Sequence, residues 1–170
     1  RQFDRMQPME ALVTDLTYVQ VGQKWHYVCF ILDLFNREIV GYSSGPNKSV
    51  DLVLQAIGTI EHPLDDVEIF HTDRGKEFDN QSIDELLAAF QIQRSLSRPG
   101  CPYDNAVAEN FFSCLKCECV HLRHFASRAQ AMADVFAYIE TFYNPVRPHS
   151  SIGWRPPDAF ARALSEHPAA

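Results

Sequence analysis

Hydrophobic and polar positions alternate along the first part of the chain in a way that is typical of β-strands. From Leu12 to Val21 successive residues switch between two faces, and one of these faces carries Asp15. A nearly continuous apolar run from His26 to Leu32 predicts a strand buried on both faces, and Glu38 to Ser43 predicts the return strand. Because the connections are short, the three strands should form an antiparallel meander.

Helical and strand periodicities alternate in the rest of the chain. The expected elements are, in chain order, a helix from 49 to 62, a strand from 67 to 73, a helix from 79 to 90, a strand from 92 to 96, a helix from 105 to 120 and a long helix from 127 to 142. This order predicts an α/β fold with a five-stranded mixed sheet flanked by helices.

Two further segments are expected to be irregular. Residues 97–104 contain two prolines and a glycine, which predicts a loop, and several prolines predict an irregular tail from 143 to 157. The core face of the last long helix is expected to consist of Met132, Val135, Phe136, Ile139 and Phe142.

Length and composition favour a single folded domain. At 170 residues with 46% hydrophobic residues the chain can bury a core. We expect residues 1–10 to be a linker, 11–163 the folded domain and 164–170 a frayed tail. No apolar run approaches the ~18 residues of a membrane span, and the first ten residues lack the apolar region of a secretory signal. Five cysteines, an odd number, fit free thiols in a reducing cytosol and therefore a cytoplasmic protein.

Charge is unevenly distributed. The net charge is −7, which argues against a nucleic-acid partner for the chain as a whole. Residues 1–93 carry 7 basic and 15 acidic side chains, whereas residues 94–155 carry 7 basic and 5 acidic ones. Contact with a nucleic acid should therefore favour the second half, and binding should be weak and sensitive to salt.

Three acids stand out from this background. Asp15 lies inside a predicted strand, where Asp is uncommon and costly to bury. Asp73 ends a later strand, in His71-Thr72-Asp73-Arg74-Gly75, at the strand end where open α/β sheets place their chemistry. Glu109 lies in the first turn of a helix, nearly opposite its apolar stripe. Each acid alone has an ordinary structural explanation, namely a strand edge, a turn and a partner for the helix dipole.

Together the three carboxylates indicate a metal site. Like charges this close repel unless a cation lies between them, and a set of oxygen ligands suits Mg²⁺ or Mn²⁺ better than zinc. Two such ions can activate a nucleophile and stabilise a leaving oxygen in phosphodiester chemistry. A zinc site built from Cys114, Cys117 and Cys119 is not expected, because these thiols project from different sides of one helix.

These motifs resemble the Asp-Asp-Glu core of retroviral-integrase-type transposases. The matching segments are Val-Thr-Asp15-Leu-Thr-Tyr, His-Thr-Asp73-Arg-Gly and Asp-Asn-Ala-Val-Ala-Glu109-Asn-Phe-Phe, with 35 residues between the last two acids. Lys116, seven residues after Glu109, resembles the basic residue of the bacterial insertion-sequence subgroup. The C-terminal signature of that subgroup is matched by Tyr143-Asn144, Arg147-Pro148-His149, Gly153 and Pro157. The resemblance covers about residues 8–160.

The resemblance implies a ribonuclease-H-like fold and metal-dependent cleavage and transfer of DNA strands at transposon ends. Asp15 and Asp73 would bind Mg²⁺ or Mn²⁺, and Glu109 would complete a two-metal site. DNA contacts are expected at Lys116, Arg98, Arg147 and His149. His71 and Asn105 are expected beside the site. The partners implied are DNA, at least a second copy of the chain and an upstream helix-turn-helix domain, which this chain lacks; no membrane is expected.

Several alternatives stay open. The chain could be a metal-dependent nuclease of the same fold without strand transfer, or a non-catalytic DNA-binding or assembly module. Arg147 and His149 could fasten the tail to the body instead of touching DNA, and His71 could be an ordinary buried histidine. Glu77 could add a further carboxylate near the metals.

Overall fold

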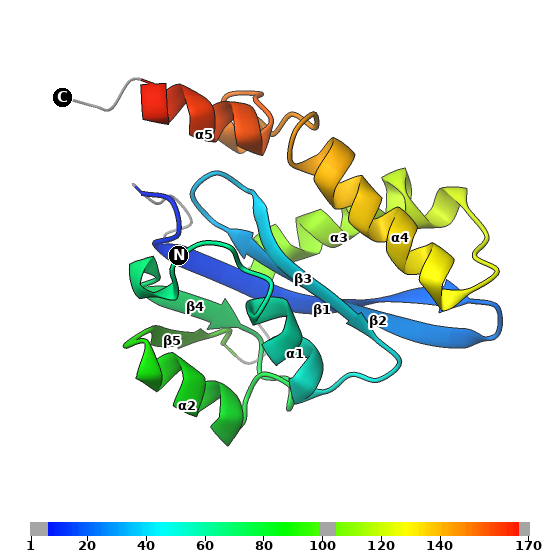
Figure 1. Cartoon of the computed structure of the whole chain (residues 1–170), viewed down its shortest axis with the longest axis horizontal. Coiled ribbons are helices and arrows are strands. Elements are labelled where there is room, and N and C mark those ends of the chain that lie inside the picture. The colour runs from blue at the N-terminus through cyan, green and yellow to red at the C-terminus, as the bar shows by residue number, and fades with distance from the viewer. Residues whose placement is uncertain (1–6, 99–104, 167–170) are drawn as a thin grey trace.

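The computed structural model describes residues 7–98 and 105–166 and contains a five-stranded mixed sheet (Figure 1). Its strands are β1 (Ala11–Val21), β2 (Lys24–Asp33), β3 (Ile39–Gly45), β4 (Ile69–Thr72) and β5 (Gln93–Leu96), in the spatial order β3-β2-β1-β4-β5. β1, β2 and β3 form the expected antiparallel meander, whereas β4 pairs parallel with β1 and β5 parallel with β4. The predicted sheet is therefore confirmed.

Four of the five α-helices among the described residues cover the two faces of this sheet. The five helices are α1 (Val50–Ile57), α2 (Gln81–Ala89), α3 (Ala106–Glu118), α4 (Arg128–Tyr138) and α5 (Pro157–Glu166). α1 and α2 pack on one face, where Leu12 and Ile31 point. α3 and α4 pack on the other face, against Val19, Val28 and Leu32 (Figure 1). Residues of β1 alternate between the two cores, as the alternating sequence predicted.

The hairpin of β1 and β2 extends beyond the rest of the sheet. Pairing between β1 and β4 covers Ala11 to Val13, whereas β1 and β2 stay paired up to Val21 and Lys24. Gly22 turns the hairpin with a φ of +58°, a value that glycine adopts without strain. Beyond the end of β4, the outer edge of β1 has no strand neighbour among the described residues.

The helix boundaries differ from the sequence prediction in two places. The first helix ends at Ile57 rather than near residue 62, and Leu64–Asp66 form a separate 3₁₀ turn. α5 was not expected at all, because the prolines before it suggested an irregular tail; Pro157 instead starts the helix, a position where its missing N–H costs nothing. Residues 164–166, expected in the frayed tail, continue α5, while 167–170 lie outside the described residues.

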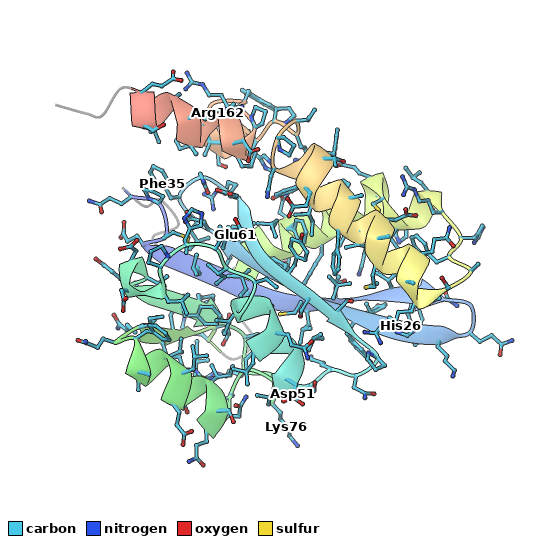
Figure 2. The ribbon with its side chains drawn as sticks, in the orientation of Figure 1. His26, Phe35, Asp51, Glu61, Lys76 and Arg162 are labelled. Carbon is cyan, nitrogen blue, oxygen red and sulfur yellow. The ribbon has the colours of Figure 1, made fainter. Side chains whose placement is uncertain are left out.

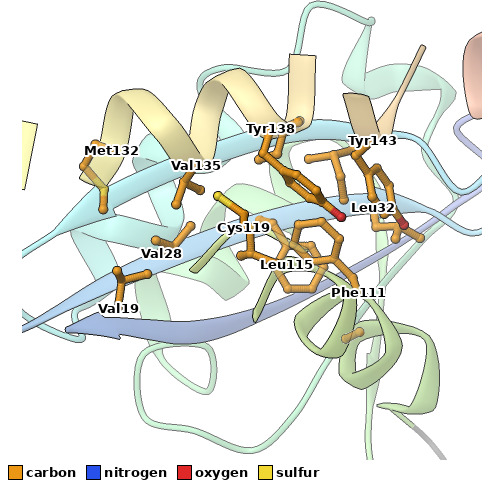
Figure 3. Packing of buried hydrophobic residues seen from close by; sticks show 14 of the residues in the cluster. Val19, Val28, Leu32, Phe111, Leu115, Cys119, Met132, Val135, Tyr138 and Tyr143 are labelled. Atoms are coloured by element: carbon orange, nitrogen blue, oxygen red, sulfur yellow. The ribbon is translucent and has the colours of Figure 1, made fainter. Parts of the chain in front are cut away.

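The core face of α4 was predicted correctly except at its end. Met132, Val135 and Tyr143 pack in the core (Figure 3). Ile139 is also buried and Phe136 is partly buried, but Phe142 is 39% exposed, whereas Tyr143 is 2% exposed. The reason is the π-helical turn Ile139–Tyr143, whose wider spacing moves the inward position on by one residue. The prediction for Phe142 was therefore wrong.

The segment after α4 closes the far end of the sheet. The side-chain amide of Asn144 donates to the carbonyl of Ile39 and accepts from its N–H, both at 3.0 Å, on the outer edge of β3. Phe35, in the turn between β2 and β3, lies against Phe160 of α5 with ring centroids 5.5 Å apart (Figure 2). Within residues 7–98 and 105–166, no helix combines the length and the apolar content needed to cross a membrane.

Candidate active site

Asp15 and Asp73 lie side by side because β1 and β4 are parallel neighbours. The last pair in that register joins Val13 to His71, so that two residues further along each strand are Asp15 and Asp73. Both positions alternate onto the face covered by α3. Asp73 comes directly after the end of β4, where its Oδ1 accepts a hydrogen bond from the N–H of Gly75 at 2.8 Å. This turn fixes the carboxylate at the strand tip.

Asp15 is held by two donors in a partly buried position. Its Oδ1 accepts from the N–H of Leu16 at 2.7 Å, and its Oδ2 accepts from the side-chain amide of Asn105 at 2.6 Å. Burial raises the pKa of Asp15 to about 6, and the nearby Asp73 charge adds to the increase, although the two hydrogen bonds oppose it. Burial therefore disfavours the charged form of Asp15.

Asn105 connects the helix that carries Glu109 to this carboxylate. It stands at the N-cap of α3, but its side chain makes no capping hydrogen bond there and reaches β1 instead. The contact ties the start of α3 to the strand that carries Asp15.

An ion pair with a buried carboxylate lies next to the two aspartates. Glu77 is 7% exposed, and its Oε1 lies 2.6 Å from Nζ of Lys48, in the loop before α1. Burial by itself would lower the pKa of Lys48, but the Glu77 carboxylate, followed by Asp73 and Asp15, raises it overall. Sequence reasoning identified Glu77 as an extra acid but missed Lys48, because no local pattern marks a lysine in a loop as a partner.

Gly75 makes room for this ion pair. A Cβ at this position would collide with the carboxylate of Glu77, so that any larger residue would displace it. The turn after β4 thus serves both acids: its backbone N–H orients Asp73, and its missing side chain admits Glu77.

Glu109 does not join Asp15 and Asp73 in a finished metal site. It lies on the exposed side of the first turn of α3. Among the described residues, no three His, Cys, Asp or Glu side chains are close enough together to hold a metal ion, and this includes the cysteines of α3. The arrangement offers a pair of carboxylates with a third one on the neighbouring helix.

Lys116 and Arg98 are the two predicted DNA contacts that lie near the surface. Lys116 is two turns after Glu109 on the same side of α3, and its Nζ lies 4.7 Å from the ring centroid of Tyr18. Arg98 is exposed and follows β5. No contact in the structure tests either residue as a DNA ligand, and both stay predictions.

Arg147 and His149 hold the C-terminal segment against the body. The guanidinium of Arg147 donates to both carboxylate oxygens of Glu118 at 2.9–3.0 Å. His149 is buried and meets the ring of Tyr143 edge-on, with centroids 4.8 Å apart. Burial, together with the positive charges of Arg147 and Arg37, lowers the pKa of His149 to about 4. These contacts agree with the alternative that Arg147 and His149 attach the C-terminal segment to the body of the domain. A DNA contact at either residue stays a prediction.

His71 is held by hydroxyl groups. Its Nδ1 lies 2.8 Å from Oγ of Ser95, and its Nε2 lies 3.1 Å from Oγ of Ser97. Both ring nitrogens are thus engaged by β5 and the residues after it, which agrees with a structural role and aligns the tip of β4 with β5.

Comparison with known proteins shows related sequences and folds. A family model described as "Integrase core domain" matches residues 5–102, and a second model with the same description matches residues 90–157. The transposase for insertion sequence element IS904 of Lactococcus lactis subsp. lactis is 37% identical over 164 residues, which cover 94% of this chain and 64% of that protein. The transposase InsF for insertion sequence IS3A of Escherichia coli is 36% identical over 157 residues, which cover 90% of this chain and 54% of that protein.

Solved structures share the fold at low sequence identity. A simian T-cell lymphotropic virus intasome chain has a TM-score of 0.71 at 13% identity and covers 90% of this chain and 54% of its own. The catalytic core domain of BIV integrase has a TM-score of 0.58 at 16% identity and covers 93% and 97%. That of HTLV-2 integrase, in complex with magnesium, has a TM-score of 0.56 at 17% identity and covers 89% and 94%. The predicted ribonuclease-H-like fold is therefore confirmed.

Proposed function

Because the chain belongs to the integrase core domain family, we propose that it is the catalytic core of a bacterial insertion-sequence transposase, which cuts DNA 3′ ends and transfers them to a target. The observation that carries the proposal is the parallel pair β1–β4, which brings Asp15 and Asp73 together beside α3. The chain spans 64% and 54% of the two curated relatives, so the activity of a complete transposase is itself part of the proposal.

The donor set fits a divalent cation. Asp15 and Asp73 would hold Mg²⁺ or Mn²⁺, since both supply only oxygen, and Glu109 would complete a second position from α3. The pKa of Asp15, raised mainly by burial and further by Asp73, supports this assignment, because a bound cation would stabilise the charged form of this carboxyl. A bound ion would polarise the phosphate and make water or a DNA 3′-hydroxyl a better nucleophile.

The residues of the chain prepare this site before any cation binds. Asn105 and Leu16 orient the two oxygens of Asp15, and Gly75 orients Asp73. Lys48 supplies positive charge beside three carboxylates. Lys116 and Arg98 are expected to contact DNA phosphates, which position the strand without reading its sequence.

Partners and surroundings follow from the same proposal. Transposition joins two DNA ends, so we expect a homodimer or larger assembly on DNA. An upstream helix-turn-helix domain would recognise the transposon ends, and the bacterial cytoplasm would be the place of action. The domain limits 11–163 also remain part of the proposal.

Metal binding provides the first test. Calorimetric titration with Mn²⁺ should show binding to the wild type and at least about tenfold weaker binding to Asp73→Asn, because a ligand is lost. Asp79→Asn, an exposed aspartate in the following turn, is the matched control and should bind like the wild type. Equal and negligible binding by the wild type and Asp73→Asn would refute the metal site.

The DNA product distinguishes a transposase from a nuclease. The protein is incubated with Mn²⁺, a target duplex and a duplex whose transposon end already has a free 3′-hydroxyl. A transposase core yields joined strands that are absent with Asp73→Asn. Shortened strands without joined product would favour the metal-dependent nuclease.

A further inference from the structure

Two large aromatic side chains are exposed on the β1–β2 hairpin. Tyr18 is 50% exposed and Trp25 is 51% exposed. Their rings meet edge to face, with centroids 4.9 Å apart and an interplanar angle of 82°. The contact runs diagonally across the hairpin, because Tyr18 is paired with Tyr27 and Trp25 lies two residues before it.

A cation from another element joins the pair. α3 packs on the opposite face of the sheet, yet Nζ of Lys116 lies 4.7 Å from the centroid of the Tyr18 ring. Its side chain therefore crosses the edge of β1 where β4 has ended. The stretch from 16 to 32 contains Lys24 and no acidic residue, in a chain whose net charge is −7. The two aromatic rings thus lie in a stretch without acidic residues, and Lys116 adds a positive charge beside Tyr18.

Tyr18 and Lys116 each follow an acid of the proposed active site, Tyr18 along β1 and Lys116 along α3. Tyr18 is three residues after Asp15, which is about 10 Å along a strand. Lys116 is seven residues after Glu109, which is about 10 Å along a helix.

We propose that Tyr18, Trp25 and Lys116 form a stacking surface for unpaired DNA bases near the carboxylates of the proposed active site. This inference rests on the proposed function. Stacking of a base on an aromatic ring is worth ~1–3 kcal/mol and does not depend on sequence. The aromatic pair would hold the bases of a DNA end that has lost its pairing, while Lys116 contacts a backbone phosphate.

A stabilising contact within the hairpin is the simpler explanation of the pair, and it makes a different prediction. Cross-strand aromatic pairs contribute ~0.2–1 kcal/mol to folding, but they do not require a lysine from a third element or favour single-stranded over double-stranded DNA. Binding of DNA therefore decides between the two explanations.

Fluorescence of Trp25 reports directly on the surface. The chain has two tryptophans, so Trp154→Phe leaves Trp25 as the sole reporter. Titration of this variant with a ten-nucleotide oligothymidine at low salt should quench the fluorescence, and a blunt duplex of equal length should quench it much less. Binding of labelled oligothymidine without any quenching would refute the proposal.

Affinity provides the second readout. Anisotropy of labelled oligothymidine should show ~5- to 150-fold weaker binding by Trp25→Ala, the range that corresponds to the loss of one stacked base. Phe90→Ala removes an aromatic ring that is 37% exposed at the end of α2 and should bind within about twofold of the wild type. Equal affinity of Trp25→Ala and Phe90→Ala, or a changed oligomeric state of Trp25→Ala without a change in affinity, would refute the stacking surface and leave the proposed function standing. A wild type that binds neither DNA would count against the proposed function itself.

Discussion

Replacing Asp15 with asparagine should stabilise the protein in the absence of metal. The pKa of this carboxyl is raised from 3.8 to about 6, so its charged form is disfavoured in the folded state. At ~1.4 kcal/mol per pKa unit, the charged Asp15 lowers the free energy of unfolding by about 3 kcal/mol at pH 8. Asparagine avoids this loss but has one acceptor oxygen, so one of the two hydrogen bonds at this position is lost at a cost of about 1 kcal/mol. The net gain is about 1–2 kcal/mol, or ~3–6 °C in Tm for a chain of this size.

The gain should depend on pH in a definite direction. Since the folded state holds the Asp15 proton more tightly, the stability of the wild type falls as pH rises from about 4 to about 6 and the loss is complete above that range. Asp15→Asn should therefore be more stable than the wild type at pH 8 and about equal to it at pH 4. Asp65→Asn changes an exposed carboxylate by the same atoms and should leave Tm within about 1 °C at either pH.

Thermal unfolding in EDTA and then in Mn²⁺ tests this reasoning. In EDTA at pH 8 the variant should melt above the wild type. In Mn²⁺ the order should reverse, because the cation stabilises the folded wild type and the variant has lost a ligand. A variant that melts below the wild type in EDTA at pH 8, or a difference that stays constant from pH 4 to pH 8, would show that burial does not destabilise the Asp15 charge.

Three further changes test other parts of the structure. Lys48→Met should lower the stability in EDTA by ~1–3 kcal/mol, because it leaves the buried carboxylate of Glu77 unpaired, and it should enlarge the Tm increase caused by Mn²⁺. Lys76→Met removes the same charge from an exposed lysine (Figure 2) and should do neither. Identical behaviour of the two variants would contradict the role of the ion pair. A double-mutant cycle of Arg147→Ala and Glu118→Gln in urea should give a coupling of ~1–3 kcal/mol for the two-oxygen contact, and a coupling near zero would mean that this contact does not fasten the tail. Burial raises the pKa of the Cys29 thiol to about 12, so mass spectrometry should find it unalkylated by iodoacetamide at pH 8 until urea unfolds the chain; rapid alkylation of the native protein would contradict its burial.

Local patterns in the sequence were sufficient to predict the five strands of the sheet and the antiparallel meander. Alternation gave β1 and its two faces, and hence the face on which Asp15 lies. The position of Asp73 followed from the end of a short strand before Arg74 and Gly75. That β4 lies beside β1, which brings the two aspartates together, depends on packing of the whole domain and is not contained in either segment.

Contacts between distant segments were beyond the reach of sequence patterns. Asn105 was expected beside the site from the resemblance, but no local pattern predicts that its amide donates to a residue 90 positions away. Lys48 was not singled out, since its partner depends on how the loop before α1 meets the turn after β4. The π-helical turn Ile139–Tyr143 has no clear sequence signal either, so Phe142 was placed in the core in error. The start of α5 at Pro157 could have been found from the preference of proline for the first turn of a helix.

Asn144 has a consequence for how copies of the protein behave towards one another. β3 is the outermost strand, and at Ile39 its free N–H and C=O would otherwise be open to another strand. A single amide occupies both groups there, much as a neighbouring backbone would. Exposed strand edges promote aggregation, so this end of the sheet is closed by a segment that comes 105 residues later in the chain. We expect a chain that stops before residue 144 to scatter more light at equal concentration than one that includes it.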